Sequence, residues 1–315
     1  MPSMRQSVRT LYSYAYDLRR FMTQSGLSGR KEIEILEAQI LREQHRIEKG
    51  LSLPSPKEWF GQTAIENTLA YCARYEQHRD RDPLITEAAL SAIAEYSRSF
   101  GTEPPEWWQG VEAQIAAFGR TAMTDSGGTK PISAAYLNPR ELPIQNLMRG
   151  RSSVRNFSEQ IVAENLIQDA IYSAKKSPSV CNRQATRIRI FRRGPDAHQL
   201  LGLQNGNRAF GHTASHIALV TSDLRCFLNP GERSQGYVDA GMFTMTFIYD
   251  LLGAGVGTCC LNWSVEPKRD KELRRSFGLP ENEAVIMMLA IGYPSTDIKV
   301  TISPARDNSR IEIDV

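Results

Sequence analysis

Apolar and polar residues follow two different periods along the chain, and the change of period divides it into two parts. From residue 11 to about residue 118 the apolar positions follow a helical spacing, most clearly in 32–46 and 84–100. Segment 50–56 contains one glycine and two prolines, which interrupt a helix. We therefore expect residues 1–140 to form an all-helical N-terminal extension.

Residues 124–131 combine glycines, small polar residues and a proline, which is the composition of a linker. Beyond them the pattern is mixed, and we expect one α and β domain over residues 141–315. A helix over 237–252 is apolar nearly all round and must be buried. A continuous apolar strand over 284–291 must be buried on both faces. The other expected elements are helices over 158–176 and 267–277 and strands over 186–191, 217–221 and 258–263.

The composition narrows the class of protein. Of the 315 residues, 41% are hydrophobic and 23% are charged, which is ordinary for a globular protein. A net charge of +3 is too weak to predict a nucleic-acid partner, and the most apolar stretch, 242–257, is too short for a membrane span. The five cysteines are odd in number and lack C-x-x-C spacing, so we expect reduced thiols and a cytoplasmic location. We interpret four arginines as solvated strand ends: Arg187, Arg189, Arg192 and Arg193.

Two short segments, 151–157 and 177–184, contain the side chains that we expect to bind a cofactor. The first contains two arginines and two serines, and the second contains two serines, an asparagine and a glutamine. Guanidinium groups bind phosphate through paired charge-assisted hydrogen bonds, and carboxamides match the polar edge of a heterocycle. We therefore expect both segments to lie within reach of one phosphorylated, ring-bearing cofactor.

Four blocks in order give residues 145–306 a resemblance to the flavin-dependent nitroreductase family. They are segments 151–157 and 177–184, the glycine-led strand entry 255–262, and the segment 289–294. The resemblance implies an α+β fold of three layers, with a mostly antiparallel central sheet flanked by helices. It also implies FMN bound between the subunits of a homodimer, with NAD(P)H as a transient hydride donor.

The resemblance also implies which residues bind the cofactor. Contacts to the phosphate, ribityl chain and pyrimidine edge are expected from the first block, and further contacts from the second. Backbone N–H groups near residue 262 are expected to face the flavin ring. The full set is Arg151, Ser152, Ser153, Arg155, Ser179, Asn182, Gln184, Asn207, Arg208, Leu261, Asn262, Trp263 and Arg306, with Arg310 as a second candidate for the last role.

The activity implied is an FMN-dependent oxidoreductase that passes electrons from NAD(P)H to a nitro, quinone or other conjugated acceptor. Because the flavin carries this chemistry, no catalytic side chain and no metal is expected. Two alternatives remain: a specialised dehydrogenase or dehalogenase on the same scaffold, and a non-catalytic binding or scaffold protein of a polysaccharide pathway.

Three other patterns receive a structural interpretation. The glycine run 253–258 lacks the third glycine of a dinucleotide loop and follows a helix, so it is interpreted as a helix stop. His212 and His216 lead into a strand, where their spacing does not converge on a metal. Cys259 and Cys260 lie in an apolar run and are interpreted as inert thiols.

Overall fold

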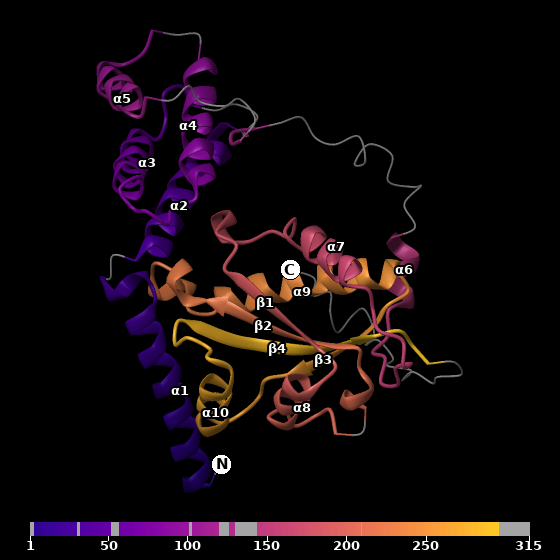
Figure 1. Ribbon diagram of the computed structural model, residues 1–315. Coiled ribbons are helices and arrows are strands. Elements are labelled where there is room, and N and C mark those ends of the chain that lie inside the picture. Colours follow the sequence, from indigo (N-terminus) through magenta and orange to yellow (C-terminus); the bar gives the residue numbers. More distant parts are fainter. Residues whose placement is uncertain are drawn as a thin grey trace, which may run out of the picture.

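The computed structural model describes residues 3–29, 32–51, 57–100, 103–119, 126–129, 144–208 and 210–295. Its N-terminal part is helical, as predicted. Figure 1 shows α2 to α5 gathered at one end of the molecule and α1 running along the side of the sheet-bearing part. The helices are α1 (Met4–Gln24), a short 3-10 turn η1 (Gly26–Ser28), α2 (Ile33–Leu51), α3 (Gln62–Tyr75), α4 (Pro83–Arg98) and α5 (Glu106–Ala117). The proposed boundary at residue 140 lies outside the described residues and stays a prediction.

Aromatic side chains pack the helical extension together. Trp108 is buried and stacks with Tyr96, whose ring centroid lies 5.6 Å away. Trp59 packs against both, and its indole fits between the ends of α4 and α5. Helix α2 also contacts the chain near residues 180 and 225, where Arg225 pairs with Glu34 at 2.8 Å. The extension therefore rests on the sheet-bearing domain.

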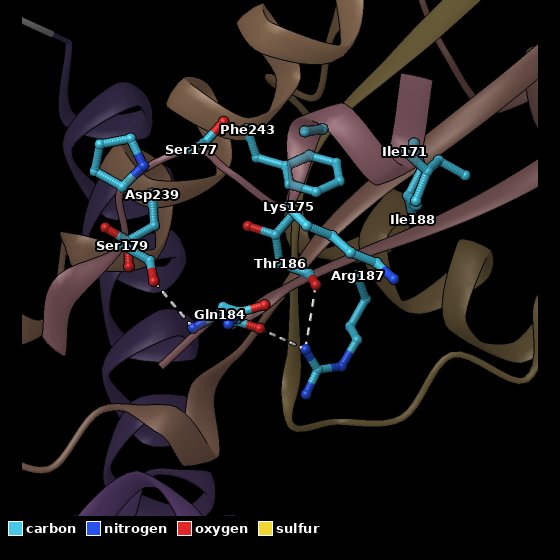
Figure 2. A pocket seen from close by; sticks show the side chains of 12 residues that line it. Ile171, Lys175, Ser177, Ser179, Gln184, Thr186, Arg187, Ile188, Asp239 and Phe243 are labelled. Atoms are coloured by element: carbon cyan, nitrogen blue, oxygen red, sulfur yellow. Dashed lines mark hydrogen bonds between the residues drawn. The ribbon is translucent and has the colours of Figure 1, made fainter. Parts of the chain in front are cut away.

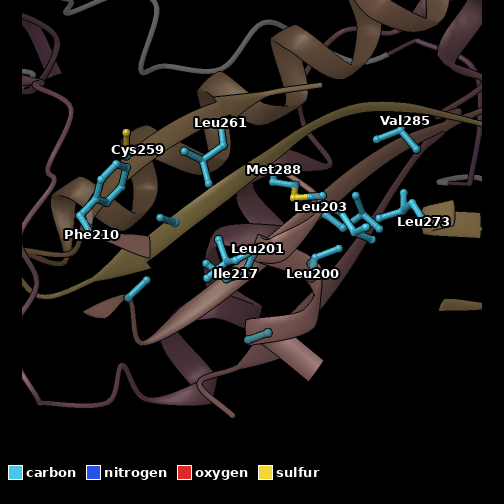
Figure 3. Packing of buried hydrophobic residues seen from close by; sticks show 14 of the residues in the cluster. Leu200, Leu201, Leu203, Phe210, Ile217, Cys259, Leu261, Leu273, Val285 and Met288 are labelled. Carbon is cyan, nitrogen blue, oxygen red and sulfur yellow. The ribbon is translucent and has the colours of Figure 1, made fainter. Parts of the chain in front are cut away.

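Four antiparallel strands form the central sheet in the order β1-β2-β4-β3. They are β1 (Thr186–Arg192), β2 (His216–Asp223), β3 (Gly257–Asn262) and β4 (Glu283–Gly292). Strand β4 therefore pairs on both sides. Along it, Met288 and Ala290 pack against one hydrophobic cluster, while Leu289 and Ile291 pack against another (Figure 3 shows the first). The prediction of a strand buried on both faces is confirmed.

Helices cover both faces of this sheet (Figure 1). Helices α7 (Glu164–Ala174) and α9 (Gln235–Gly253) lie on one face, and α8 (Pro195–Gly202) and α10 (Pro267–Phe277) lie on the other. Helix α6 (Ile144–Gly150) precedes them, and 3-10 turns η4 (Val180–Asn182), η5 (Gly211–Thr213), η6 (Leu224–Cys226) and η7 (Pro230–Glu232) connect them. Helix α9 ends in a turn through Gly255 at φ 73°, so the glycine run is a helix stop, as interpreted. The expected three-layer α+β architecture is confirmed.

A buried carboxylate joins α1 to α10. Asp270 accepts hydrogen bonds from Tyr16 Oη at 2.7 Å, Trp263 Nε1 at 3.0 Å and Arg274 Nε at 2.7 Å. Beside it, Arg20 donates to the carbonyl oxygens of Glu281 and Glu283. The Arg274 charge and these three donors outweigh desolvation and hold the pKa of Asp270 below its usual value. The first helix is thereby tied to the end of β4.

We expect this carboxylate to make stability pH-dependent. Because its folded pKa is depressed, its contribution is fully present above its unfolded pKa of about 3.9 and is lost as the pH falls through the folded pKa. Asp270→Asn should lower the free energy of unfolding by about 3 kcal/mol at pH 7, because Arg274 then lacks its counter-charge.

Urea unfolding of both proteins between pH 3 and pH 7 measures this difference. It should begin to shrink below about pH 4, where the carboxyl of the unfolded chain takes up a proton while the folded carboxyl is still ionised. The exposed Asp169→Asn in α7 is the matched control and should change stability by less than about 0.5 kcal/mol. A deficit in Asp270→Asn that is independent of pH would contradict the assignment.

Candidate functional site

Segment 151–158 lies along the ends of β3 and β4. Ser153 forms a parallel bridge with Thr258, and Phe157 forms an antiparallel bridge with Pro294. Two strand glycines make this close approach possible. A Cβ atom at Gly257 would lie 2.6 Å from Cγ2 of Val154, and one at Gly292 would lie 2.8 Å from Cδ1 of Phe157. The backbone of the first motif is therefore fixed against the sheet.

This placement gathers the two motif arginines near the start of β3. Burial raises the pKa of the Cys259 thiol, and Arg155, Ser153 and Arg151 are close enough to offset part of that rise. The thiol therefore stays neutral at pH 7, in line with the interpretation as an inert cysteine. Neither arginine pairs with a carboxylate of the described residues, so both guanidinium groups remain able to bind an anion.

The second motif forms a tight turn held by a buried arginine. Arg183 donates to both carboxylate oxygens of Glu232, at 3.1 and 2.6 Å, and to the carbonyl oxygen of Cys226. Val180 N–H donates to Asp239 at 3.1 Å, and Gln184 N–H donates to Ser179 Oγ at 3.1 Å. Arg183 is therefore an anchor of the turn, and its side chain has no spare capacity for a ligand.

The same turn holds its backbone in an unusual conformation. Cys181, Asn182 and Gln184 have φ values of 49°, 52° and 48°, in the left-handed region that residues other than glycine rarely adopt. Such conformations persist where the surroundings enforce them, and they are concentrated at binding sites. Here the Arg183–Glu232 pair enforces them, and the side chains of Asn182 and Gln184 are exposed as a result.

A cavity of about 280 Å³ opens beside this turn. Figure 2 shows apolar walls formed by Ile171, Ile188 and Phe243, with polar side chains at the rim. The polar lining includes two motif residues, Ser179 and Gln184, and two cations, Lys175 and Arg187. Arg187 is held by the carbonyl oxygen of Gln184 at 2.8 Å. The cavity suits a flat ring with a polar edge.

Sequence reasoning missed part of this lining. Arg187 was interpreted as a solvated strand end, but it lines the cavity, and Arg189 forms a bidentate pair with Glu283 at 2.6 and 2.7 Å. The interpretation holds for Arg192, which is exposed, and is wrong for these two. It is also wrong for Arg193, which is half-buried and donates to the carbonyl oxygens of Ala214 at 3.0 Å and Ser158 at 3.2 Å. The alternation of arginine with isoleucine in β1 was the available signal, because it gives the strand one polar face.

The remaining predicted residues lie elsewhere. Asn207 is buried, and its amide nitrogen donates to the carbonyl oxygens of Leu201 and Gln204, so only its Oδ1 atom is left for a ligand. Arg208 and His212 line a second cavity of about 290 Å³. His216 lies apart from that cavity, buried in β2 with Nδ1 2.8 Å from Ser215 Oγ. Within the described ranges, no group of three His, Cys, Asp or Glu side chains could hold a metal ion.

Strand β3 offers backbone donors at its outer edge. It is an edge strand, and the described chain pairs with its outer side at Thr258. Leu261 is buried in the core, and Asn262 ends the strand with an exposed side chain. Trp263 follows and is fixed by its hydrogen bond to Asp270. These positions fit the backbone role predicted for them, while Ser152 is half-buried and Arg306 lies outside the described residues.

The two motifs do not meet within one chain. The first bridges Thr258, which pairs with Ile291, whereas the second leads into Thr186, which pairs with Ser222 and through it with Ala284. Seven residues of β4 separate these positions, which is about 23 Å at ~3.3 Å per residue. The expectation that both motifs reach one molecule is therefore not met inside a single subunit. The two motifs therefore lie at opposite ends of the sheet.

No helix in the described part of the chain is long and apolar enough to cross a membrane. The described cysteines are all free thiols. Cys72, Cys226 and Cys259 are buried, whereas Cys260 is exposed, so the interpretation of Cys259 and Cys260 as buried thiols holds for Cys259 alone. Burial raises the pKa of Cys226 to about 12. These thiols are therefore protonated and unreactive at neutral pH.

Comparisons with known proteins point to the same family. Residues 192–293 match the model of the nitroreductase family. A protein of Archaeoglobus fulgidus, provisionally named NADH dehydrogenase/NAD(P)H nitroreductase, is 24% identical over 150 residues, covering 47% of this chain and 83% of that protein.

Similar solved structures cover the same half of the chain. A provisionally named nitroreductase from Desulfovibrio desulfuricans, solved with FMN, has a TM-score of 0.49 and 19% identity, covering 56% of this chain and 98% of its own. An FMN-dependent nitroreductase from Clostridium difficile R20291 has a TM-score of 0.45 and 16% identity, covering 54% and 98%. The family match agrees with the resemblance predicted from the sequence: residues 192–293 match the nitroreductase-family model, and the domain that contains them has an α+β fold.

Proposed function

We propose that the protein is an FMN-dependent oxidoreductase of the nitroreductase type. NAD(P)H is the hydride donor, and a nitro, quinone or other conjugated compound is the acceptor. The observation that carries the proposal is the pair of half-sites at opposite ends of the sheet in a nitroreductase-family domain. One half supplies unpaired cations, and the other supplies an apolar slot with a polar rim.

The first half-site fits the phosphate and polar chain of FMN. Arg151 and Arg155 are free of carboxylate partners among the described residues, and Ser153 is fixed between them by its bridge to Thr258. The planar guanidinium group of Arg151 can hold a dianionic phosphate with paired charge-assisted hydrogen bonds, which leaves Arg155 for the pyrimidine edge. A serine hydroxyl adds one donor and two acceptors for a polyol chain.

The second half-site fits part of a flat aromatic ring. Ile171, Ile188 and Phe243 form apolar walls, and Ser179 and Gln184 supply polar atoms at the edge. The cavity of about 280 Å³ lies just below the usual ~300–1,000 Å³ of small-molecule pockets. A cavity of this size would enclose part of a flavin, which is the expectation for half a site.

A symmetric homodimer would complete the site. In a two-fold dimer the same surface of each copy contacts the other. Segment 151–155 of one copy can therefore face the cavity beside segment 177–184 of its partner, and this contact occurs twice in the dimer. The separation of about 23 Å within one chain is the reason to invoke a second copy. Five free thiols, one of them exposed at Cys260, support a reducing compartment, and we propose a cytoplasmic location.

FMN, when bound, accepts hydride from NAD(P)H and passes electrons to the acceptor. The protein's own residues bind and orient. Arg155 would stabilise negative charge on the pyrimidine edge, and outer-edge N–H groups near Asn262 would fix the ring without covering its face. Arg208 is a further contact proposed for that edge, and Arg306 stays a prediction.

Purification of the protein and its visible spectrum give the first test. We expect the purified protein to contain bound oxidised flavin, which absorbs at roughly 450 nm. NAD(P)H added without oxygen should bleach this absorption, and a quinone or nitroarene should restore it. Colourless protein that does not bind added FMN would refute the proposal. Flavin that no nicotinamide reduces would refute the oxidoreductase activity alone.

Arg151→Ala and Arg155→Ala should each weaken FMN binding by roughly 10- to 100-fold, since a hydrogen bond to a charged group contributes about 1.5–3 kcal/mol. Fluorescence titration of the apoprotein measures the dissociation constant. Arg192→Ala removes an exposed arginine of β1 outside both half-sites and is the control, with unchanged affinity expected. Equal affinities in all three variants would contradict the phosphate assignment.

Subunit mixing tests whether the site spans two chains. One variant carries Arg151→Ala and Arg155→Ala, and the other carries Ser179→Ala and Gln184→Ala; each alone should bind FMN weakly. After denaturation and joint refolding, mixed dimers should regain one intact site each, or about a quarter of all sites for random pairing. If both halves of a site came from the same chain, mixing would restore nothing.

A further inference from the structure

Helix α1 is amphipathic in the reverse of the usual sense. Apart from Phe21, which is buried near the end of the helix, the side toward its own domain makes polar contacts. Tyr16 donates to Asp270, Arg20 donates to Glu283 O, and Arg9 pairs with Glu266. The outer side is apolar, and its large side chains are between 51% and 86% exposed. A surface helix ordinarily buries its apolar stripe and leaves its polar face in water. The outer face of α1 therefore lacks its partner in one subunit.

The outer side chains follow a coiled-coil spacing. They recur at intervals of four and three residues, which is the a and d repeat of a helix that pairs with another helix. Five large apolar residues and one alanine occupy all six positions of the repeat along α1: Met4, Val8, Leu11, Ala15, Leu18 and Met22. We call this set the α1 stripe. It is a narrow seam suited to one helix.

The charges beside the α1 stripe argue for a protein partner over a lipid surface. A membrane-binding helix keeps its cations free beside a broad apolar face. Here Arg20 is buried and bound to Glu281 and Glu283, and Arg9 is paired with Glu266, on the side away from the stripe. Arg5 and Arg19 flank the stripe along one edge.

We infer that the α1 stripe pairs with the α1 stripe of a second copy of this chain, with the two helices parallel. An antiparallel pair would place Arg5 beside Arg19 of the other copy at both ends, whereas a parallel pair separates these charges and places Tyr14 beside Arg19. Six such side chains bury on the order of 500 Å² per copy, over half of the ~800 Å² of a standard interface. The pair rests on the α1 stripe alone, and it does not depend on flavin.

The sharpest test places charge in the seam. Leu11→Glu combined with Leu18→Glu should raise the dissociation constant of the assembly at least 100-fold, measured by analytical ultracentrifugation. Thr23→Glu places the same charge on an exposed position of α1 outside the α1 stripe and should leave assembly unchanged. Circular dichroism checks that α1 remains helical. An unchanged constant in the folded double variant would overturn the inference, while loss of flavin with assembly intact would count against the proposed function alone.

Disulfide trapping tests the orientation. Leu11→Cys should form a covalent dimer under mild oxidation, because identical d positions face each other in a parallel pair. Wild-type protein, with its five cysteines, and Thr23→Cys are the controls and should remain uncrosslinked. Failure of Leu11→Cys to crosslink would overturn the parallel pair. A flotation assay with anionic phosphatidylserine vesicles tests the membrane alternative. If the wild-type protein floats with the vesicles and the Leu11→Glu and Leu18→Glu variant does not, the α1 stripe binds a membrane and the inference is overturned.

Discussion

The antiparallel pairing of β4 is the constraint on which the other features depend. It hydrogen-bonds to β2 on one side and β3 on the other, and its side chains enter both hydrophobic clusters. One end of β4 receives the first motif through Pro294 and Ile291, and the other end lies beside the second motif through Ala284. The register of β4 against β2 shifts once, between Val220 and Thr221, and the two ends of the strand still place the two motifs at opposite ends of the sheet.

Most secondary structure followed from sequence because it depends on local periodicity. The helix 237–252 and the strand 284–291 each carry a long apolar run, and both lie where such runs must lie, in the core. The motif residues were also identifiable locally, since the arginines and amides stand in short, ordered blocks.

The features that the sequence did not predict depend on contacts between residues that are far apart in the chain. The register of β4 separates the two motifs, and no local pattern encodes a strand order of β1-β2-β4-β3. Asn207 resembles a ligand in sequence, but the carbonyl oxygens that occupy its amide belong to the turn after α8. Arg189 could be recognised as half of a buried pair only once Glu283, 94 residues later, was seen beside it. The helical extension was predicted as helices, but its contact with the second motif was not.

Dissolved salt acts on the two sides of α1 in opposite directions. The helix is attached to its own domain by charges and hydrogen bonds, including Arg9–Glu266 and the contact of Lys271 with Tyr12. Ions screen the exposed members of that set within a Debye length of about 8 Å at physiological strength. Strongly hydrated anions such as sulfate meanwhile favour burial of apolar surface. A rising sulfate concentration therefore weakens the exposed contacts of the helix with its own domain and strengthens its attraction to apolar neighbours. The more buried contacts of Tyr16 and Arg20 are screened much less, so they keep the helix in place.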